Sequence, residues 1–284
     1  MTLTLRCPVC HESLAQSLHT SGTGLGCLQN HQFDRARQGY FNLLPGHKKR
    51  SKNPGDDKTM VQARTRFLDK GYYQPVADSL AKTLDSLETF SESNRSILDA
   101  GCGEGYYTER LQQAFPGTSV VGLDISKPAI MACCKRSKTV QWLVASVNDI
   151  PVKDQEADFI VSVFSRCDWS EFARLLKPEG HVLVLSPGEN HLLELRQVIY
   201  ETVRPYPVDK LLDQLPESFN LTETKAVKGS MQLNSAEDIM DLLAMTPHYW
   251  HVKPSQKEKL ASLGALQCLF DMKLYVIQRA SRKR

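Results

Sequence analysis

The chain has 284 residues, of which 41% are hydrophobic and 24% are charged, and its formal net charge is +3. This length allows one large domain and one small one, and the composition is ordinary for a globular chain. No run approaches the roughly 18 apolar residues that cross a bilayer, and the first six residues lack the apolar core of a signal peptide. We therefore expect a cytoplasmic protein without membrane contact, whose net charge is too small to indicate nucleic acid by itself.

Residues 1–45 are rich in Cys, His and Gly and predict a small metal-binding domain. Cys7 and Cys10 lie on one tight turn, and sixteen residues further on Cys27 and His31 lie on another. Four ligands of this kind suit one closed tetrahedral zinc ion, which is a structural site because no position is left for a substrate water. A segment with so little apolar content needs such a staple to be ordered.

The alternative for this segment is a redox Cys-x-x-Cys pair with Cys27 and His31 unrelated to it. Such pairs usually lie where a strand runs into a helix, which the sequence does not indicate here. His11 and His19 are rival imidazoles, but only Cys27 with His31 completes a symmetrical spacing. The remaining cysteines are expected to be small buried hydrophobes: Cys102, Cys133, Cys134, Cys167 and Cys268.

Residues 46–57 are polar, basic and rich in turn residues, and they predict an exposed loop or linker. Its positive charges are candidates for contact with RNA phosphates, which we prefer to a merely solvated loop: Lys48, Lys49, Arg50 and Lys52. Phe33, Tyr40 and Phe41 could stack on unpaired bases or form a small core around the metal. We favour the core for Tyr40 and Phe41 and leave both interpretations open for Phe33.

Residues 58–284 predict an α/β domain. Two helices are expected over 58–90, and apolar runs then alternate with helical segments, which indicates a parallel sheet covered on both faces. The predicted strands are Ser96–Asp99, Ser119–Asp124, Val140–Ala145, Ala157–Phe164 and His181–Ser186. A strand near Met231 leads into a helix capped by Ser235, with Asp238 three residues on, and a helix near 254–264 precedes the last strand, "LFDMKLYVIQR".

The stretch "SILDAGCGEGYYTERL" predicts a strand, a glycine turn and a helix. Gly101, Gly103 and Gly105 let the backbone approach a ligand closely, a logic that dinucleotide enzymes share. Asp124 ends the next strand, where a carboxylate can accept from ribose hydroxyls. Asp99 and Glu104 would repel a pyrophosphate but suit a sulfonium and an ammonium, so the turn resembles the S-adenosylmethionine motif of methyltransferases.

Two further segments resemble class I methyltransferases. "LLKPEGHVLVLSP" is typical of the turn before their fifth strand, and "VASVNDIPV" matches the adenine-edge segment, where Ser146 or its neighbours would contact the base. The resemblance implies a Rossmann-like domain with a mostly parallel seven-stranded sheet, whose last strand is antiparallel.

Seven segments in the same order resemble the bacterial 23S rRNA guanine-N1 methyltransferases, from Cys7 to about Trp250. They are the Cys/His segment, "HQFDRARQGYFNLLP", "HKKRSKNPGD", "ARTRFLDKGYYQP", "LDAGCGEGYYT", "GLDISKPAI" and "MTPHYW". The resemblance implies zinc on Cys7, Cys10, Cys27 and His31, and a guanine in a hairpin loop as the target. It also implies a cofactor surrounded by Tyr73, the Gly101–Gly105 turn, Tyr107, Thr108, Asp124 and His191.

The acceptor pocket is expected at "FSRCD", after the fourth strand of the α/β domain. Methylation of guanine N1 displaces a proton, and Asp168 is a hypothetical acceptor for it, although a surface helix cap is an equal alternative. Arg166 could steady guanine O6, but relatives more often carry proline there. Cys167 raises a cytosine-C5 mechanism, which normally places proline before the cysteine, and the Asn/Asp-Pro-Pro-aromatic segment of amine methylases is absent.

Two other functions remain as alternatives. A small-molecule methyltransferase of quinone or metabolite type would share the glycine turn but lack the zinc segment and the basic run. A non-catalytic RNA-binding or ribosome assembly protein would not need the intact acidic groups of the donor site. The expected partner is 23S rRNA, free or in an assembling large subunit, and a homodimer is left open.

Overall fold

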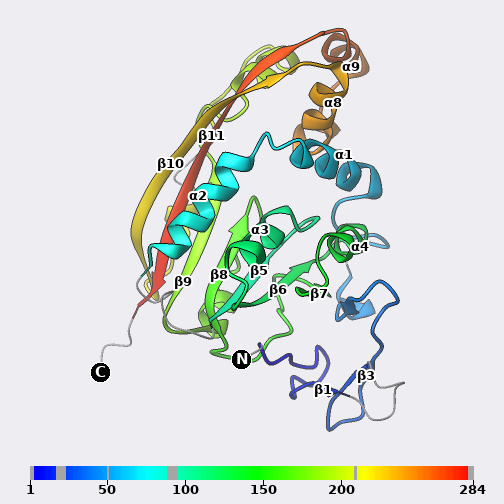
Figure 1. Cartoon of the computed structure of the whole chain (residues 1–284), viewed down its shortest axis with the longest axis vertical. Coiled ribbons are helices and arrows are strands. Elements are labelled where there is room, and N and C mark those ends of the chain that lie inside the picture. The colour runs from blue at the N-terminus through cyan, green and yellow to red at the C-terminus, as the bar shows by residue number, and fades with distance from the viewer. Residues whose placement is uncertain (1–2, 17–23, 50, 88–94, 208–209, 281–284) are drawn as a thin grey trace.

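The computed structural model describes residues 3–16, 24–49, 51–87, 95–207 and 210–280 (Figure 1). Its centre is an eight-stranded sheet in the order β10-β11-β9-β8-β5-β6-β7-β4. The strands are β4 (Phe41–Asn42), β5 (Ser96–Ala100), β6 (Ser119–Asp124), β7 (Gln141–Val144), β8 (Ala157–Val163), β9 (Leu176–Pro187), β10 (Phe219–Leu233) and β11 (Leu266–Arg279).

The sheet confirms the predicted topology and adds one strand to it. Neighbouring strands from β4 to β9 are parallel, and β11 is antiparallel to both β9 and β10. The eighth strand, β4, comes from the N-terminal segment and pairs with β7 at the edge of the sheet. Two residues are too short a run to show a strand pattern, which is why the sequence did not reveal it.

Both faces of the sheet are covered, as predicted. Consecutive residues of β5 belong to different hydrophobic cores, since side chains alternate along a strand. Ile97 packs in the core that holds Phe67 and Leu80, whereas Leu98 packs in the core that holds Leu5 and Phe172. The helices are α1 (Lys58–Asp69), α2 (Gln74–Asp85), α3 (Tyr106–Ala114), α4 (Lys127–Arg136), α5 (Trp169–Leu175), α6 (Leu193–Ile199), α7 (Lys210–Asp213), α8 (Ala236–Ala244) and α9 (Pro254–Ala261), with short 3-10 turns at Gly46–Lys48 and Pro247–Trp250.

The C-terminal elements follow the prediction in type and differ in length. Ser235 caps α8 by accepting from the Asp238 backbone N–H at 3.1 Å. However, β10 begins at Phe219, well before the predicted strand, and forms a long antiparallel ribbon with β11. Most side chains of its first half are exposed and polar, so no apolar alternation marked it in the sequence.

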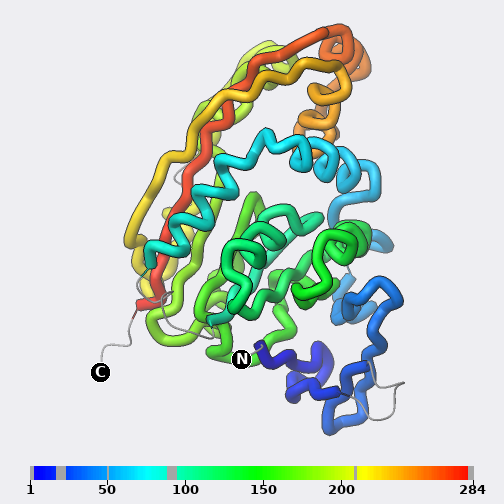
Figure 2. Tube along the Cα trace, viewed as in Figure 1, coloured from blue at the N-terminus to red at the C-terminus, as the bar shows by residue number. Residues whose placement is uncertain are grey.

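The N-terminal segment forms a small antiparallel sheet of β1 (Ala15–Gln16), β2 (Leu25–Gly26) and β3 (Gln32–Phe33). It lies at the opposite end of the molecule from α8 and α9 (Figure 2). Leu5 forms a β-bridge with Val152, so the segment is joined to the large domain at more than one point. The domain boundary at residue 45 stays a prediction. Among the described residues no helix is long and apolar enough to span a bilayer.

Candidate active site and metal centre

A cavity of about 760 Å³ opens at the carboxyl ends of the parallel strands, where ligands bind in open α/β sheets. Residues at or just beyond the ends of four strands line it: Asp99 and Gly101 at the end of β5, Asp124 and Ile125 at the end of β6, Phe164 and Arg166 after β8, and Ser186 and Pro187 at the end of β9. The predicted site residues Tyr73, Gly103, Glu104, Tyr107 and His191 also line it.

The glycine turn between β5 and α3 has a backbone that other residues rarely adopt. Gly101, Gly103 and Gly105 have φ of 87°, 57° and 85°. A Cβ on Gly101 would lie 2.0 Å from the Ser165 Oγ, and one on Gly105 would lie 3.0 Å from both Cys133 and Trp142. Conformation and close approach therefore both require glycine at Gly101 and Gly105.

Two buried carboxylates beside this turn have oxygen atoms that lack hydrogen bonds. Asp99 accepts from the Thr108 hydroxyl at 2.6 Å through Oδ2, while its Oδ1 has no hydrogen-bond partner among the described residues. Burial raises the pKa of Asp99 to about 7, opposed by the Thr108 bond and aided by the charges of Asp124 and Glu104. Glu104 is equally buried; burial raises its pKa, which the positive charges of Arg64 and Arg136 oppose.

These free acceptors fit a cationic ligand. The Glu104 Oε1 lies 3.8 Å from the Arg136 guanidinium, too far for a hydrogen bond, and nothing else in the described chain bonds it. A buried acceptor without a partner is costly, so a bound donor group would relieve it. The ammonium of S-adenosylmethionine is such a donor, and its sulfonium adds the positive charge that acidic walls attract.

Asp124 shapes the turn from the end of β6. Its Oδ2 accepts from the Gly103 N–H at 3.0 Å and its Oδ1 from the Ser126 N–H at 2.7 Å. Burial raises the pKa of Asp124, and these two backbone bonds oppose the rise. Each carboxylate oxygen can accept a second bond, so the side chain keeps capacity for ribose hydroxyls.

Uncharged aromatic groups form another part of the wall. The Tyr73 and Tyr107 hydroxyls are buried and unpaired within the described residues, and burial raises the pKa of both phenols. His191 lies 6.3 Å from the Tyr73 ring, and burial lowers its pKa to about 4, helped by the nearby Arg196 charge. The wall therefore offers polar groups without adding positive charge.

The sequence prediction missed several residues that line this cavity. Gly55 and Asp56, which were assigned to the linker, line it together with Arg64. Arg64 pairs with Asp56 at 2.6 Å and donates to the Met245 carbonyl at 3.1 Å, and Met245 begins the cavity-lining part of "MTPHYW". The turn residues of "NPGDD" were the signal in the sequence for a tight turn here. In the structure Gly55 has φ of 82°, and a Cβ there would lie 2.8 Å from the Cβ of Ser126.

Three predicted cofactor residues lie outside the lining. Gly105 ends the glycine turn as the residue before α3, and the Thr108 hydroxyl donates a hydrogen bond to Asp99. The Ser146 hydroxyl accepts from the Asn148 N–H at 3.2 Å, within the turn that follows β7. Its contact with adenine stays a prediction.

Asp168 is the N-cap residue of α5. It precedes α5 and accepts from the Glu171 N–H at 3.2 Å, and it lies apart from the residues that line the cavity. Burial raises the pKa of Asp168, but hydrogen bonds from Ser170 and Asn148 outweigh this effect and hold the pKa below its usual value. Asp168 therefore forms the helix cap that was the equal alternative in the sequence, and its role as a proton acceptor stays a prediction.

Cys167 likewise gives no support to a cysteine mechanism. Burial raises the pKa of its thiol to about 11, and a hydrogen bond with Ser162 opposes the rise only in part. A nucleophilic cysteine needs a lowered pKa, because the thiolate is the reactive form.

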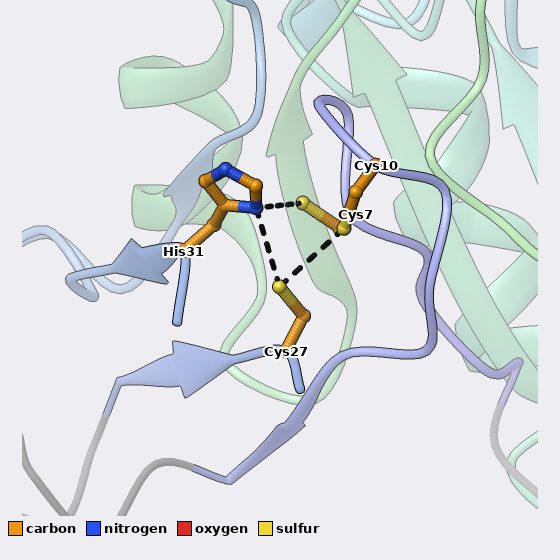
Figure 3. A group of neighbouring side chains, drawn as sticks. All are labelled: Cys7, Cys10, Cys27 and His31. Atoms are coloured by element: carbon orange, nitrogen blue, oxygen red, sulfur yellow. Dashed lines mark hydrogen bonds between the residues drawn. The ribbon is translucent and has the colours of Figure 1, made fainter. Parts of the chain in front are cut away.

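Cys7, Cys10, Cys27 and His31 meet at one point (Figure 3). Their ligand atoms all lie within 4.8 Å of one another, and Cys27 Sγ lies 3.5 Å from Cys10 Sγ and 3.4 Å from His31 Nδ1. Ordinary Zn–S and Zn–N bond lengths in a tetrahedron place such atoms about 3.5–3.8 Å apart, so the set fits zinc. Burial raises the pKa of the Cys27 thiol, but hydrogen bonds outweigh this effect, first that of the His31 backbone, and lower the pKa to about 7. His19 lies outside the described residues.

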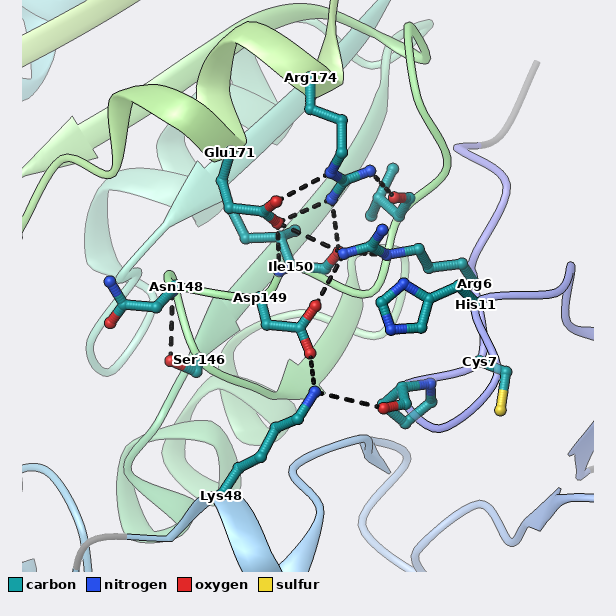
Figure 4. Close-up of polar contacts among 12 residues, drawn as sticks. Arg6, Cys7, His11, Lys48, Ser146, Asn148, Asp149, Ile150, Glu171 and Arg174 are labelled. Atoms are coloured by element: carbon teal, nitrogen blue, oxygen red, sulfur yellow. Dashed lines mark hydrogen bonds and ion pairs between the residues drawn. The ribbon is translucent and has the colours of Figure 1, made fainter.

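A charged cluster joins the N-terminal segment that carries these four ligands to the turn after β7 (Figure 4). Asp149 pairs with Arg6 at 2.7 Å and with Lys48 at 2.5 Å. Arg6 also donates to the Ile150 carbonyl at 3.2 Å. Lys48 is thus partnered within the protein, while Lys49 and Lys52 are exposed and Arg50 lies outside the described residues.

Two of the aromatic residues near the metal cluster are buried, but in different cores. Phe41 packs in the core that holds Cys7 and Cys27, as expected for a core around the metal, whereas Tyr40 packs in the opposite core of the large domain. Phe33 is half-buried and packs at the margin of the same core as Phe41.

Fold and site together define a class I S-adenosylmethionine-dependent methyltransferase that carries a zinc ribbon. A family model described as "RlmA, N-terminal", a zinc ribbon, matches residues 5–52, and one described as "Methyltransferase domain" matches residues 97–180. A methyltransferase structure from Bacillus halodurans is 14% identical, with a TM-score of 0.50, and covers 72% of this chain and 98% of its own. That likeness concerns the fold alone.

Curated relatives match both parts of the chain at once. The 23S rRNA (guanine(748)-N(1))-methyltransferase of Streptomyces fradiae is 32% identical over 254 residues, which cover 89% of this chain and 88% of the relative. A Micromonospora griseorubida protein that carries the name 23S rRNA (guanine-N(1)-)-methyltransferase provisionally is 31% identical over 265 residues, with the same coverage. The chain belongs to the family of 23S rRNA (guanine-N1-)-methyltransferases.

Proposed function

We propose that the protein transfers a methyl group from S-adenosylmethionine to N1 of a guanine in a hairpin loop of 23S rRNA. The observation that carries the proposal is the continuity between the two sites. The basic segment that leaves the zinc ribbon, with Lys49 and Lys52 exposed, runs directly into Gly55 and Asp56 on the wall of the cofactor cavity. RNA held by ribbon and loop through its phosphates would therefore lie at the cavity mouth.

The chain's own residues would bind and orient the donor. Asp99 and Glu104 have acceptor oxygens without hydrogen bonds that would receive its ammonium end, and Asp124, in the same lining, would accept from the ribose hydroxyls. When bound, S-adenosylmethionine supplies an electrophilic methyl group. Most of the acceleration comes from holding methyl carbon and guanine N1 in line at near-attack distance.

Arg166 would act on the acceptor base. Its exposed side chain lines the same cavity and has no hydrogen bond or ion pair within the described chain. A guanidinium beside guanine O6 stabilises negative charge there and so makes the N1–H more acidic. The transfer breaks the C–S bond and forms the N1–C bond, and the N1 proton leaves to solvent.

The two alternatives receive less support. Small-molecule methyltransferases do not need a zinc ribbon, and relatives match across ribbon and domain together. A non-catalytic RNA-binding protein has no use for buried carboxylates with open acceptor atoms beside a glycine turn.

Mapping of reverse-transcription stops on 23S rRNA tests the proposal. Methylation of N1 blocks the Watson–Crick edge, so incubation with protein and donor should create one strong stop at a hairpin-loop guanine. Labelled donor should move label into naked rRNA and not into a total small-molecule extract. Label in the extract with no new stop would contradict the proposed substrate.

A further inference from the structure

Phe164 is an exposed aromatic residue on the wall of the cavity, directly after β8. It is 43% exposed, and its φ is 51°. A bulky non-glycine residue rarely adopts a positive φ, and strained conformations of this kind concentrate at functional sites. The fold thus holds a costly backbone where an apolar ring meets the cavity.

The left-handed backbone turns this ring toward the cavity. Along a regular strand, Val163 and Phe164 would project to opposite faces, yet both line the cavity. The Phe164 N–H donates to the Leu185 carbonyl at 2.9 Å, and the next residue, Ser165, packs against Gly101 so closely that a Cβ there would meet its hydroxyl. The ring is therefore fixed beside the glycine turn that would hold the methyl donor.

His191 supports one face of the Phe164 ring. The two rings are stacked, with centroids 5.8 Å apart and an angle of 28° between their planes. The imidazole is anchored because its Nδ1 accepts from the Asp271 N–H at 3.4 Å. It is uncharged near neutral pH, since burial lowers its pKa to about 4, so the ring pair does not repel a cationic donor.

We propose that Phe164, supported by His191, is the platform on which the target base stacks during methyl transfer. This inference rests on the proposed function. A guanine that swings out of its stack in the hairpin loop loses contact with neighbouring bases, and an aromatic face would replace that contact. Because the platform is fixed by the glycine turn, it would set the height of guanine N1 relative to the methyl carbon.

Three substitutions separate stacking from simple packing. Phe164→Leu keeps apolar volume without a ring, Phe164→Asn tolerates the left-handed backbone, and Phe164→Tyr keeps the ring. With a 23S rRNA hairpin as substrate, loss of a base–aromatic stack should lower kcat/KM by roughly 5- to 150-fold in Leu and Asn, while Tyr stays within about threefold of the parent. Calorimetry with S-adenosylmethionine alone confirms that each variant is folded and binds the donor.

A fluorescent base gives a second readout that packing alone would not move. With 2-aminopurine in place of the target guanine, a base stacked on Phe164 should be quenched in the parent complex and brighter in the Leu complex. Equal brightness, or a Leu variant within about twofold of the parent in kcat/KM, would overturn the platform alone. If the parent protein produced no stop on 23S rRNA, the proposed function would fail and the platform with it.

Discussion

The zinc ribbon and the cofactor cavity are ordered by different means. In the ribbon the strands β1, β2 and β3 are two residues long, and side chains such as Leu28 and Val9 are exposed, 88% and 50% respectively. At the cavity, β5 is buried on both faces and the turn is fixed by glycine contacts. The ribbon therefore depends on a metal as well as on Leu5 and Cys7, which pack in the same core as Leu98, while packing alone shapes the cavity. Each should be damaged without destroying its neighbour.

Removal of a zinc ligand should produce the largest difference between the regions. Cys27→Ser should abolish the zinc content, measured as about one ion per chain in the parent, since structural zinc contributes on the order of 10 kcal/mol to such small domains. Amide exchange in residues 24–49 should rise, and rRNA methylation should be lost. Donor affinity, by calorimetry, should change little.

Cys167→Ser is the matched control for this variant, because Cys167 lies outside the four-ligand cluster and should leave zinc content unchanged. Loss of donor binding in Cys27→Ser would contradict the independence of the two regions.

Gly101→Ala should damage the opposite region. The added Cβ would lie 2.0 Å from the Ser165 Oγ at a φ of 87°, which adds backbone strain of about 1–2 kcal/mol to overpacking of about 1–3 kcal/mol. We expect donor affinity to fall by at least about tenfold while zinc stays bound. Gly117→Ala is the control, because a Cβ there meets nothing within 4 Å. Parent-like donor binding in Gly101→Ala would show that the turn is not the cofactor loop.

Asp149→Asn should loosen the joint between the regions. The change removes the charge that pairs with Arg6 and Lys48, and for a partly buried cluster we expect a loss of about 1–3 kcal/mol in the free energy of unfolding. The Michaelis constant for rRNA should rise, with donor affinity retained. Asp154→Asn breaks a more exposed pair with Arg174 and should cost under about 1 kcal/mol. Equal effects of the two substitutions on the rRNA constant would refute a joint at Asp149.

A pH titration should give the smallest effect. Because the pKa of Asp99 is raised to about 7, the carboxyl is neutral below that value and ionises above it. Donor affinity should therefore increase as pH rises from 6 to 8, by up to about tenfold. The raised pKa of Asp99 also adds to the free energy of unfolding below about pH 4, and this contribution is lost as pH rises from about 4 through 7. Asp99→Asn should flatten the donor profile, and an unchanged slope in that variant would exclude Asp99 as its source.

The sequence predicted those parts of the site that depend on local spacing. The four zinc ligands lie in two short turns, at Cys7 and Cys10 and at Cys27 and His31, and the glycines follow one strand. Their chemistry can therefore be predicted from residues that are close along the chain. The sequence left two roles open for Asp168, because a helix cap and a proton acceptor use the same residue type; the structure shows the cap, and the catalytic role stays a prediction.

The missed residues depend on contacts between distant segments. Asp56 reaches the cavity through Arg64 and the Ser126 hydroxyl, which donates to the Asp56 carbonyl at 2.6 Å. Phe164 belongs to the segment that was expected to line the acceptor pocket, but its orientation depends on Leu185 and Gly101, which the strand pattern does not reveal. The exposed polar strand β10 was hidden for a related reason, since its order comes from pairing with β11.

The short strand β4 also limits how this protein can be re-engineered. Phe41 and Asn42 pair in register with Leu143 and Val144, and the Leu43 N–H continues the ladder to the Val144 carbonyl at 2.9 Å. A chimera that exchanged the ribbon up to Tyr40 would keep β4, which covers the edge of the sheet at β7. A chimera that also removed Phe41 and Asn42 would expose β7 to pairing with other chains. The natural crossover for grafting a foreign RNA-recognition module is therefore upstream of Tyr40.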